Sequence, residues 1–169
     1  MSNHNFFSQA FTEMHPPMIL SSVRVVACSW ILIVSSAVST LSMPRIDSLK
    51  SVLNTATDKE RVQILNNLSR EYRYIALDSS FMYARQAQTL AEKLDDKLGV
   101  GFALRSIGQV YENQGKYDMA LDYQFQALSA FEQAEHLPGI ASASNLIGDI
   151  YRAQEKYEKA LTSYRRALE

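Results

Sequence analysis

Several residue types that often carry catalysis or cross-linking are scarce in this sequence. Its 169 residues include one cysteine, Cys28, and three histidines. A single cysteine cannot close a disulfide within the chain, so the fold must be held together by packing alone. The sequence also has no glycine-rich phosphate loop and no pair of residues at metal-ligand spacing. We therefore expect no cofactor and no metal site.

An excess of charge of either sign is also missing. The chain carries 17 basic and 18 acidic side chains, a formal net charge of −1. This balance removes the electrostatic case for nucleic acid or an anionic membrane surface as a partner. His136, the only histidine after residue 42, is expected at the carboxyl end of a helix. The acidic pairs Asp95/Asp96 and Glu155/Glu158 have no nucleophile spaced to meet them. We expect that the protein is not an enzyme; a hydrolase or transferase that uses these residues is the alternative.

What the sequence has instead is one pattern that occurs twice. Residues 107–111 read Ile-Gly-Gln-Val-Tyr and residues 147–151 read Ile-Gly-Asp-Ile-Tyr, and a similar second segment follows each at 115–121 and 155–161. A single constant offset relates the two copies over their whole length. Repetition with a period in this range is typical of stacked arrays, in which each unit covers the apolar face of its neighbour. The pattern therefore favours a binding surface over a reaction centre.

Each copy is predicted to fold as two helices. The apolar and small residues from Leu104 to Tyr111 recur at intervals of three and four, which places them on one face of a helix. Residues 113–116 have the composition of a turn, and a second helix with similar spacing follows. Gly108 and Ala120 are the smallest residues on the two faces, so they allow the helix backbones to approach closely. The sequence thus predicts an all-α fold of helical hairpins.

These residues resemble the tetratricopeptide repeat (TPR) family, whose helix pairs carry a small residue after an aliphatic one, an aromatic residue three positions on and a second-helix alanine. The resemblance implies an all-α, TPR-like α-solenoid of antiparallel helical hairpins. The family period is about 34 residues, so the longer period here is similar to a long-helix subclass of bacterial signalling proteins. Two departures are Gln124, where the next copy has Tyr164, and Glu155, where the first copy has Gly115. The packing residues that the resemblance implies are Ser69, Tyr72, Ala84, Gly108, Tyr111, Ala120, Ala127, Gly148, Tyr151, Ala160, Tyr164 and Ala167.

A degenerate copy is predicted ahead of these two. A capping-box sequence at Thr57–Glu60 marks its start. Leu68, Ser69 and Tyr72 repeat the first-helix pattern, and Ala84 is matched to Ala120. In this register Ala84 follows Tyr72 at a greater distance along the chain than Ala120 follows Tyr111, so we expect about one extra turn near Ile75–Ser80. The predicted order is a leader over 1–42 and a TPR-like domain over 43–169, made of a leading helix over 44–54, the degenerate repeat over 57–95, a repeat over 98–136 and a truncated repeat over 138–169.

The leader has the composition of a targeting segment. Residues 25–41 contain no charge, Arg24 precedes them and Trp30–Val34 form their apolar centre. A basic flank, a short apolar run and small residues indicate a secretory signal with cleavage near Ala37–Ser39, and an uncleaved anchor is the alternative. A lipoprotein box ending at Cys28 is disfavoured because the strongest apolar run follows it. We expect an exported protein, periplasmic or anchored facing the periplasm, that meets the membrane only through residues 25–41; a cytoplasmic location is the alternative.

The resemblance also implies a ligand groove. In the family, side chains two before, two after and five after the first-helix aliphatic residue commonly face a concave groove. Amide and guanidinium groups at such positions suit an extended peptide, so a protein or peptide is the expected partner, although an ordinary solvated helix face has the same composition. The candidate groove residues are Asn66, Arg70, Arg73, Arg105, Gln109, Glu112, Asn145, Asp149 and Arg152.

Taken together, these features predict a non-enzymatic protein- or peptide-binding TPR module. The resembling bacterial proteins join an export segment and repeats to a histidine kinase or a DNA-binding output domain. The expected role is therefore the extracytoplasmic sensory or scaffolding part of a bacterial signalling protein, the amino-terminal fragment of a histidine kinase or transcriptional regulator. A stand-alone periplasmic scaffold in envelope assembly is the alternative. No capping helix follows the last repeat before Glu169, so we expect a continuing chain or self-association at that end.

Overall fold

The computed structural model describes residues 45–168, and every regular element in this range is a helix. The leader predicted over residues 1–42 lies outside the described residues. A short helix covers residues 45–53, and no helix among residues 45–168 has the length and apolar character needed to span a bilayer. The longer helices are α2 (Asp58–Tyr72), α3 (Leu77–Lys93), α4 (Lys97–Asn113), α5 (Tyr117–Gln133), α6 (Leu137–Ala153) and α7 (Tyr157–Arg166).

The helices from α3 to α7 begin at evenly spaced positions because their connections are alike. Each connection contains a residue with a left-handed backbone: Asp95, Gly115, Glu135 or Glu155, with φ between 51° and 71°. The amide of the next residue then reaches back to the last helical turn, as in the bond from Lys116 N to Tyr111 O at 2.9 Å. This termination satisfies carbonyl groups that the helix end would otherwise leave unpaired. One period of the sequence therefore corresponds to two equal helix-plus-turn units.

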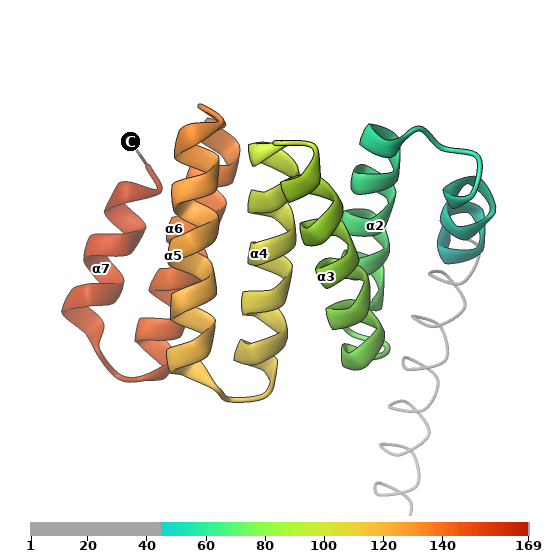
Figure 1. The fold of residues 1–169 in the computed structure, drawn as a ribbon. Coiled ribbons are helices and arrows are strands. Elements are labelled where there is room, and N and C mark those ends of the chain that lie inside the picture. The colour runs from blue at the N-terminus through green and yellow to red at the C-terminus, as the bar shows by residue number, and fades with distance from the viewer. Residues whose placement is uncertain (1–44, 169) are drawn as a thin grey trace, which may run out of the picture. The chain divides into compact units, whose positions relative to one another are not determined.

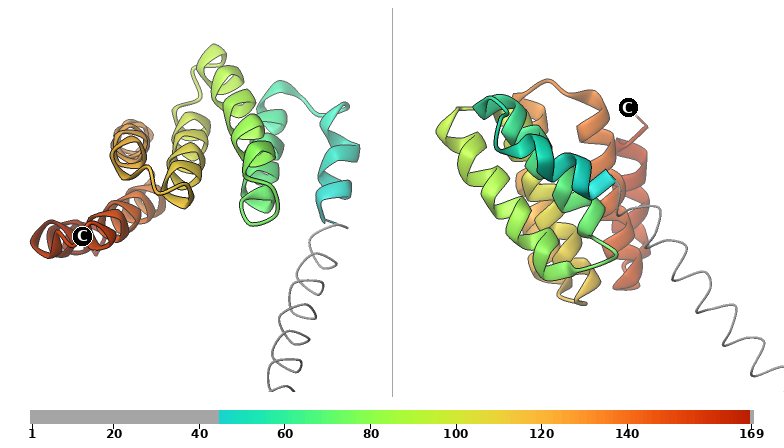
Figure 2. Two further views of the ribbon diagram at one scale, coloured as in Figure 1. Left: turned by 90° about the horizontal axis from the view of Figure 1, so that it is seen from below. Right: turned by 90° about the vertical axis from the view of Figure 1, so that its right-hand side faces the viewer.

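The helices follow one another in chain order as a row of antiparallel neighbours (Figures 1 and 2). The backbone of α2 also approaches that of α4, and α4 approaches α6, whereas no such approach links α3, α5 and α7. The row is consequently bent toward α2, α4 and α6. These first helices line its concave face, and α3, α5 and α7 lie on the convex side. The predicted TPR-like α-solenoid is confirmed.

Small residues allow the helices of each hairpin to meet. A methyl group added to Gly108 would lie 2.6 Å from Nε2 of Gln124, and one added to Gly148 would lie 2.5 Å from the ring of Tyr164. Both distances are shorter than van der Waals contact, so a larger residue at either position would have to displace the side chain opposite it. Among the predicted packing residues, five are half-buried (Tyr72, Tyr111, Tyr151, Tyr164 and Ala167) and the other seven are buried: Ser69, Ala84, Gly108, Ala120, Ala127, Gly148 and Ala160.

Phe131 provides the largest fully buried side chain of the core. Its ring meets the Phe102 ring edge to face, with centroids 5.2 Å apart. Gly101 of α4 and Gly139 of α6 leave the space that this ring occupies. Full burial of a phenylalanine side chain contributes about 1.5–3 kcal/mol. This single ring therefore ties α5 to the first helices on both sides of it.

The structure corrects the expected register of the degenerate repeat. No extra turn lies near Ile75–Ser80; the step from the start of α2 to the start of α3 is in fact one residue shorter than the step from α4 to α5. Ser80 therefore takes the place of Ala120, and Ala84 takes the place of Gln124. Ser80 is buried and its hydroxyl donates to the carbonyl of Ser69 at 2.8 Å. The error arose because α3 carries alanines at intervals of three and four, which fit two registers equally well.

Helix starts are capped in two different ways. The Asp96 carboxylate accepts a hydrogen bond from the Gly99 amide at 2.9 Å at the start of α4, and the Nδ1 atom of His136 accepts one from the Gly139 amide at 3.0 Å at the start of α6. His136 lies just beyond the carboxyl end of α5, as expected, and its amide bonds to Phe131 O at 2.9 Å, but its side chain caps the start of α6 instead of interacting with the end of α5. At the start of α2, the Glu60 carboxylate accepts a hydrogen bond from the Thr57 amide at 2.9 Å, as the capping box predicts.

Candidate ligand-binding face

The nine residues predicted for the groove all belong to the first helices, which form the concave face. Each helix supplies three of them, one per turn, so the residues form rows that run across the face. Arg70, Asn145 and Arg152 are exposed and the other six are half-buried. The positions are Asn66, Arg70 and Arg73 on α2, Arg105, Gln109 and Glu112 on α4, and Asn145, Asp149 and Arg152 on α6.

Three hydrogen bonds link this face from one first helix to the next. In each, a side chain on one helix reaches a group one to two turns earlier on the following helix. The bonds fix the donor side chains across the face and leave their remaining polar atoms beside the groove. They join Asn66 Nδ2 to Gly99 O at 3.1 Å, Arg73 Nη1 to Gln109 Oε1 at 2.6 Å, and Arg105 Nη1 to Ser142 Oγ at 3.0 Å.

Arg70, Arg73 and Arg105 gather where α2 faces α4. Within residues 45–168 none of the three forms an ion pair with a carboxylate. Their acceptors are neutral, including the Asn67 amide oxygen, which lies 3.2 Å from Arg70 Nη2. Burial lowers the pKa of Arg105, and the positive charges of Arg73 and Arg70 lower it further. The three guanidinium groups therefore have no direct ion-pair partner within residues 45–168, although Arg73 lies close enough to Glu112 to lower its pKa and Asp96 lines the same region.

Carboxylates lie on the same face where α4 meets α6. Burial raises the pKa of Glu112, the nearby charge of Asp149 raises it further, and Arg73 and Arg152 oppose the shift. Asp149 accepts hydrogen bonds from the Tyr164 hydroxyl at 2.9 Å and from Arg152 at 3.4 Å. Asp149 thus has partners within the fold, whereas the half-buried Glu112 side chain makes no hydrogen bond within residues 45–168. The sign of charge changes along α4, from Arg105 to Glu112.

A cavity of about 440 Å³ opens between α2 and α4 beside the arginines. Val62, Leu98 and Phe102 form its apolar wall, and Asn66, Arg70 and Arg105 are among its polar residues. The polar residues of this cavity were predicted from the sequence, but its apolar wall was not. The missed residues lie one or two helical turns before the predicted polar residues, on the same faces of α2 and α4. Extending the predicted face by three- and four-residue steps toward the amino ends of these helices would have included them. The cavity offers both an apolar surface and charged groups.

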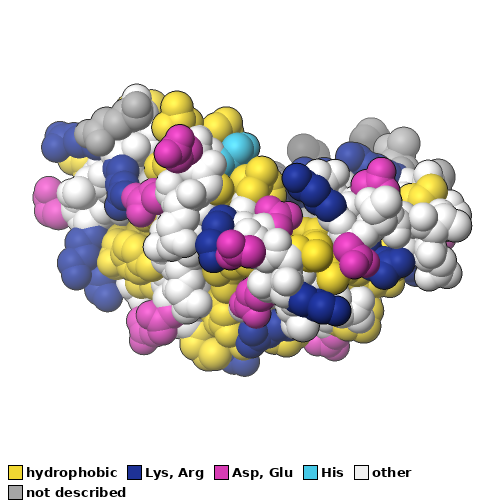
Figure 3. Space-filling model, turned by 45° about the horizontal axis from the view of Figure 1, so that its top comes forward, with side chains coloured by type: hydrophobic (Ala, Val, Ile, Leu, Met, Phe, Trp, Pro, Cys, Tyr) yellow, Lys and Arg dark blue, Asp and Glu magenta, His cyan; other side chains and the backbone are white. Residues whose placement is uncertain are grey.

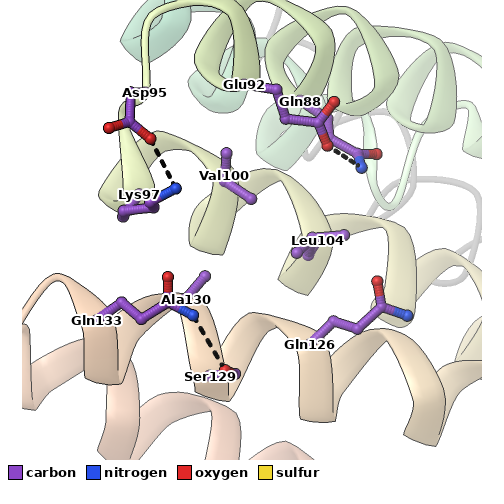
Figure 4. Close-up of a pocket in the computed structure, with 10 residues that line it drawn as sticks. All are labelled: Gln88, Glu92, Asp95, Lys97, Val100, Leu104, Gln126, Ser129, Ala130 and Gln133. Carbon is purple, nitrogen blue, oxygen red and sulfur yellow. Dashed lines mark hydrogen bonds and ion pairs between the residues drawn. The ribbon is translucent and has the colours of Figure 1, made fainter.

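A second depression, of about 420 Å³, lies on the convex side, where α3 and α5 flank α4 (Figure 4). Its polar side chains largely satisfy one another. Lys97 pairs with Asp95 at 2.6 Å, and the Gln88 amide donates to Glu92 at 2.7 Å. A ligand here would have to break these contacts, so the concave face is the better candidate.

Two further hollows lie within residues 45–168: one of about 490 Å³ beside the connection from α3 to α4, whose lining includes Asp95, Asp96 and Lys97, and one of about 390 Å³ on α3. In the view of Figure 3, Lys and Arg side chains are interspersed with Asp and Glu side chains and with apolar ones. Among residues 45–168, no three His, Cys, Asp or Glu side chains are grouped so that they could hold a metal ion.

Antiparallel helical hairpins that stack at a fixed period and present one face of their first helices define a helical-repeat protein of the solenoid class. Residues 102–169 match a family model described as tetratricopeptide repeat, and residues 42–126 match one described as the SusR N-terminal TPR domain. The chain belongs to the tetratricopeptide repeat family. Domains of this family typically act as protein-interaction modules, so protein binding is the general role that the family indicates.

Solved structures share the fold. The TPR domain of Arabidopsis FLU is 24% identical, covers 66% of this chain and 95% of its own length, and superposes with a TM-score of 0.59. BtubC (BKLC) from P. vanneervenii is 16% identical, covers 88% of this chain and 67% of its own length, and has a TM-score of 0.62. At these identities the likeness concerns the fold alone. No curated protein matches the chain.

Proposed function

We propose that the concave face of α2, α4 and α6 binds an extended segment of another protein, and that this binding, without a catalytic step, is the function of residues 45–168. The observation that carries the proposal is the cavity between α2 and α4, which places an apolar wall beside guanidinium groups that have no carboxylate partner within the described residues. A bound peptide could supply both an apolar side chain and an anionic group. Membership of the TPR family supports the same role.

We propose further that the chain is the extracytoplasmic sensory or scaffolding part of a bacterial signalling protein, of the histidine kinase or transcriptional regulator type. Two observations support this context: the uncharged segment over residues 25–41 and the match to the SusR N-terminal TPR domain. Self-association through the outer face of α7 is part of the proposal, because Leu161 there is 45% exposed.

Site-specific photo-cross-linking in the source cells tests the binding face. A photoreactive amino acid replaces Asn145, which is exposed on the concave face, or Asp122, an exposed control on α5. We expect a discrete cross-linked protein with the label at Asn145 and none with the label at Asp122. Equal cross-linking at both positions, or none at either, would contradict the proposed face.

An enzyme fusion tests the proposed location. Alkaline phosphatase, which folds to its active form only outside the reducing cytoplasm, is fused after Met43. We expect an active fusion, and deletion of residues 25–41 should abolish its activity. A fusion that is inactive although the protein accumulates would exclude export.

A further inference from the structure

The distribution of charge on the concave face narrows the kind of peptide that it accepts; this inference rests on the proposed function. At the α2 edge, Arg70, Arg73 and Arg105 lie together with only neutral hydrogen-bond partners within the described residues. Three guanidinium groups repel one another, and a carboxylate placed among them would form charge-assisted hydrogen bonds that the free protein lacks. This cluster is therefore complementary to an acidic group of the ligand.

An apolar side chain should lie next to that acidic group. The cavity beside the arginines is walled by Val62, Leu98 and Phe102, and Arg70 and Arg105 belong to its lining. The Arg105 guanidinium sits over the Phe102 ring, 5.1 Å from its centroid, so the charged and apolar parts of the cavity adjoin. A ligand residue that fills the cavity thus brings its neighbour within reach of the arginines.

Further along α4, Glu112 reverses the sign of the face. It is half-buried, and the charges of Asp149, Arg73 and Arg152 act on its pKa. Asp149 is held by Tyr164 and Arg152, and Arg73 donates its short hydrogen bond to Gln109. Glu112 makes no hydrogen bond or ion pair of its own within residues 45–168, which leaves its carboxylate for a cationic side chain of a ligand.

The distance between Arg105 and Glu112 on the protein determines how far apart the acidic and basic residues of the peptide should be. Arg105 and Glu112 are seven residues apart on one helix, which corresponds to about 10 Å along its axis. An extended peptide advances about 3.3 Å per residue. We infer that the concave face selects an extended segment with an apolar residue next to an acidic one and a basic residue about three positions from the acidic one, the acidic residue lying on Arg70 and Arg105 and the basic residue on Glu112.

Binding of defined peptides to the full chain tests this selection. The probe is a fluorescein-labelled nonapeptide, acetylated and amidated at its ends, that contains Leu-Glu-Ala-Ser-Lys, and its binding is followed by fluorescence anisotropy. We expect peptides in which Glu and Lys are one or six positions apart, or in which Glu is replaced by Gln, to bind at least tenfold more weakly. A peptide with a free terminal carboxylate and no internal Glu separates the two sources of a carboxylate. Equal affinity across the spacings, or binding only with the free terminus, would overturn the inference.

Charge reversal in the protein provides the matched test. Arg70→Glu changes an exposed groove residue and should weaken binding at least tenfold, because it faces the peptide carboxylate with a like charge. Lys93→Glu makes the same change in net charge on α3, outside the concave face, and should alter the affinity less than twofold. The peptide with Gln in place of its Glu should be far less sensitive to Arg70→Glu than the parent peptide, because it carries no carboxylate for the new charge to repel. Equal weakening by both variants, or equal sensitivity of the two peptides to Arg70→Glu, would contradict the assignment.

The failure of this inference can be told from the failure of the proposed function. If none of the peptides binds while the label at Asn145 still captures a protein in cells, the charge spacing is wrong and the binding face stands. If neither the peptides nor the label detects binding, both are wrong.

Discussion

The α4–α5 and α6–α7 hairpins share a backbone arrangement but fill their closest contact with different side chains. Gln124 packs on Gly108, and Tyr164 packs on Gly148 at the equivalent place in the next hairpin. Gln124 is fully buried and its amide donates to a backbone carbonyl of α4 at 3.1 Å, whereas Tyr164 is half-buried and its hydroxyl reaches Asp149 at 2.9 Å. These two hairpins therefore keep glycine at the contact while the residue opposite varies and finds a polar partner; in the α2–α3 hairpin the buried Ser69 takes the place of the glycine.

The two hairpins also differ in how they are covered. Leu121 on α5 is 9% exposed because α6 packs over it, whereas Leu161, its counterpart on α7, is 45% exposed. The contrast is larger two helix turns further on, where Leu128 is 4% exposed and Leu168 is 89% exposed. Within residues 45–168 no helix follows α7, so the same residue type is buried in one copy and exposed in the other, because burial in a stacked array comes from the neighbouring unit.

Of the changes predicted here, alanine substitution of Leu121 and Leu161 should give the largest difference in the free energy of unfolding between the two hairpins. Leu121→Ala removes buried methyl groups and leaves a cavity, so we expect a loss of about 2–5 kcal/mol in the free energy of unfolding. Leu161→Ala should cost less than about 1 kcal/mol, since its side chain is already partly in water. Urea unfolding followed by circular dichroism measures both.

Sedimentation of the same variants sharpens the comparison. If α7 pairs with a second copy through its outer face, Leu161→Ala should shift the protein toward monomer and Leu121→Ala should not, at concentrations where both are folded. Similar losses of stability for the two leucines, with no change in association, would mean that α7 is covered in solution in some other way.

The regular part of the fold could be predicted from the sequence because its determinants are local. The repeated glycine and tyrosine fixed the helix pairs from Lys97 onward, and Thr57–Glu60 marked the start of α2. The register of α3 was mistaken because its small residues recur at several positions, and only contact with α2 shows that Ser80 faces Ser69. A sequence with several small residues can specify a helix, but the register in which that helix packs on its neighbour is then set by tertiary contacts.

The candidate site was predictable only in part, for a related reason. Helical spacing predicted that Arg70 and Arg105 lie on the concave side of their helices, and both lie on α2 and α4, which line that face. Their closeness to each other depends on the bend of the row, which follows from how α2 approaches α4 and cannot be obtained from either helix alone. Phe102 was missed because an aromatic residue on a helix face is normally part of the core, and here it also borders the cavity.

Leucine substitution of Gly108 and Gly148 should have the next largest effect on the free energy of unfolding. Gly108→Leu must displace the buried Gln124, and the carbonyl oxygen of Ala120 would lie 3.2 Å from the new methylene, so we expect a loss of about 1–3 kcal/mol. Gly148→Leu should cost less, because Tyr164 is half-buried on the ten-residue α7 and can move outward.

Thermal and urea unfolding measure both glycine variants. Ala153→Leu adds the same side chain at an exposed position of α6 and should be nearly neutral. A loss for Gly148→Leu that equals or exceeds that of Gly108→Leu would show that α7 is held as firmly as α5, against the comparison of the two hairpins.

The smallest effect concerns the turns of the two hairpins. Gly115 and Glu155 both have a left-handed backbone, with φ of 71° and 60°. A side chain in this conformation costs about 1–2 kcal/mol, part of which glycine loses again through the greater freedom of the unfolded chain. We therefore expect Glu155→Gly to raise the free energy of unfolding by about 0.5–1 kcal/mol.

Glu158→Gly, the same substitution three residues on within α7, should instead lower it by about 1 kcal/mol, because glycine is unfavourable inside a helix. A gain at position 155 in chemical unfolding would show that the second hairpin tolerates a strained turn, whereas a loss would mean that the Glu155 side chain makes a stabilising contact that outweighs the strain.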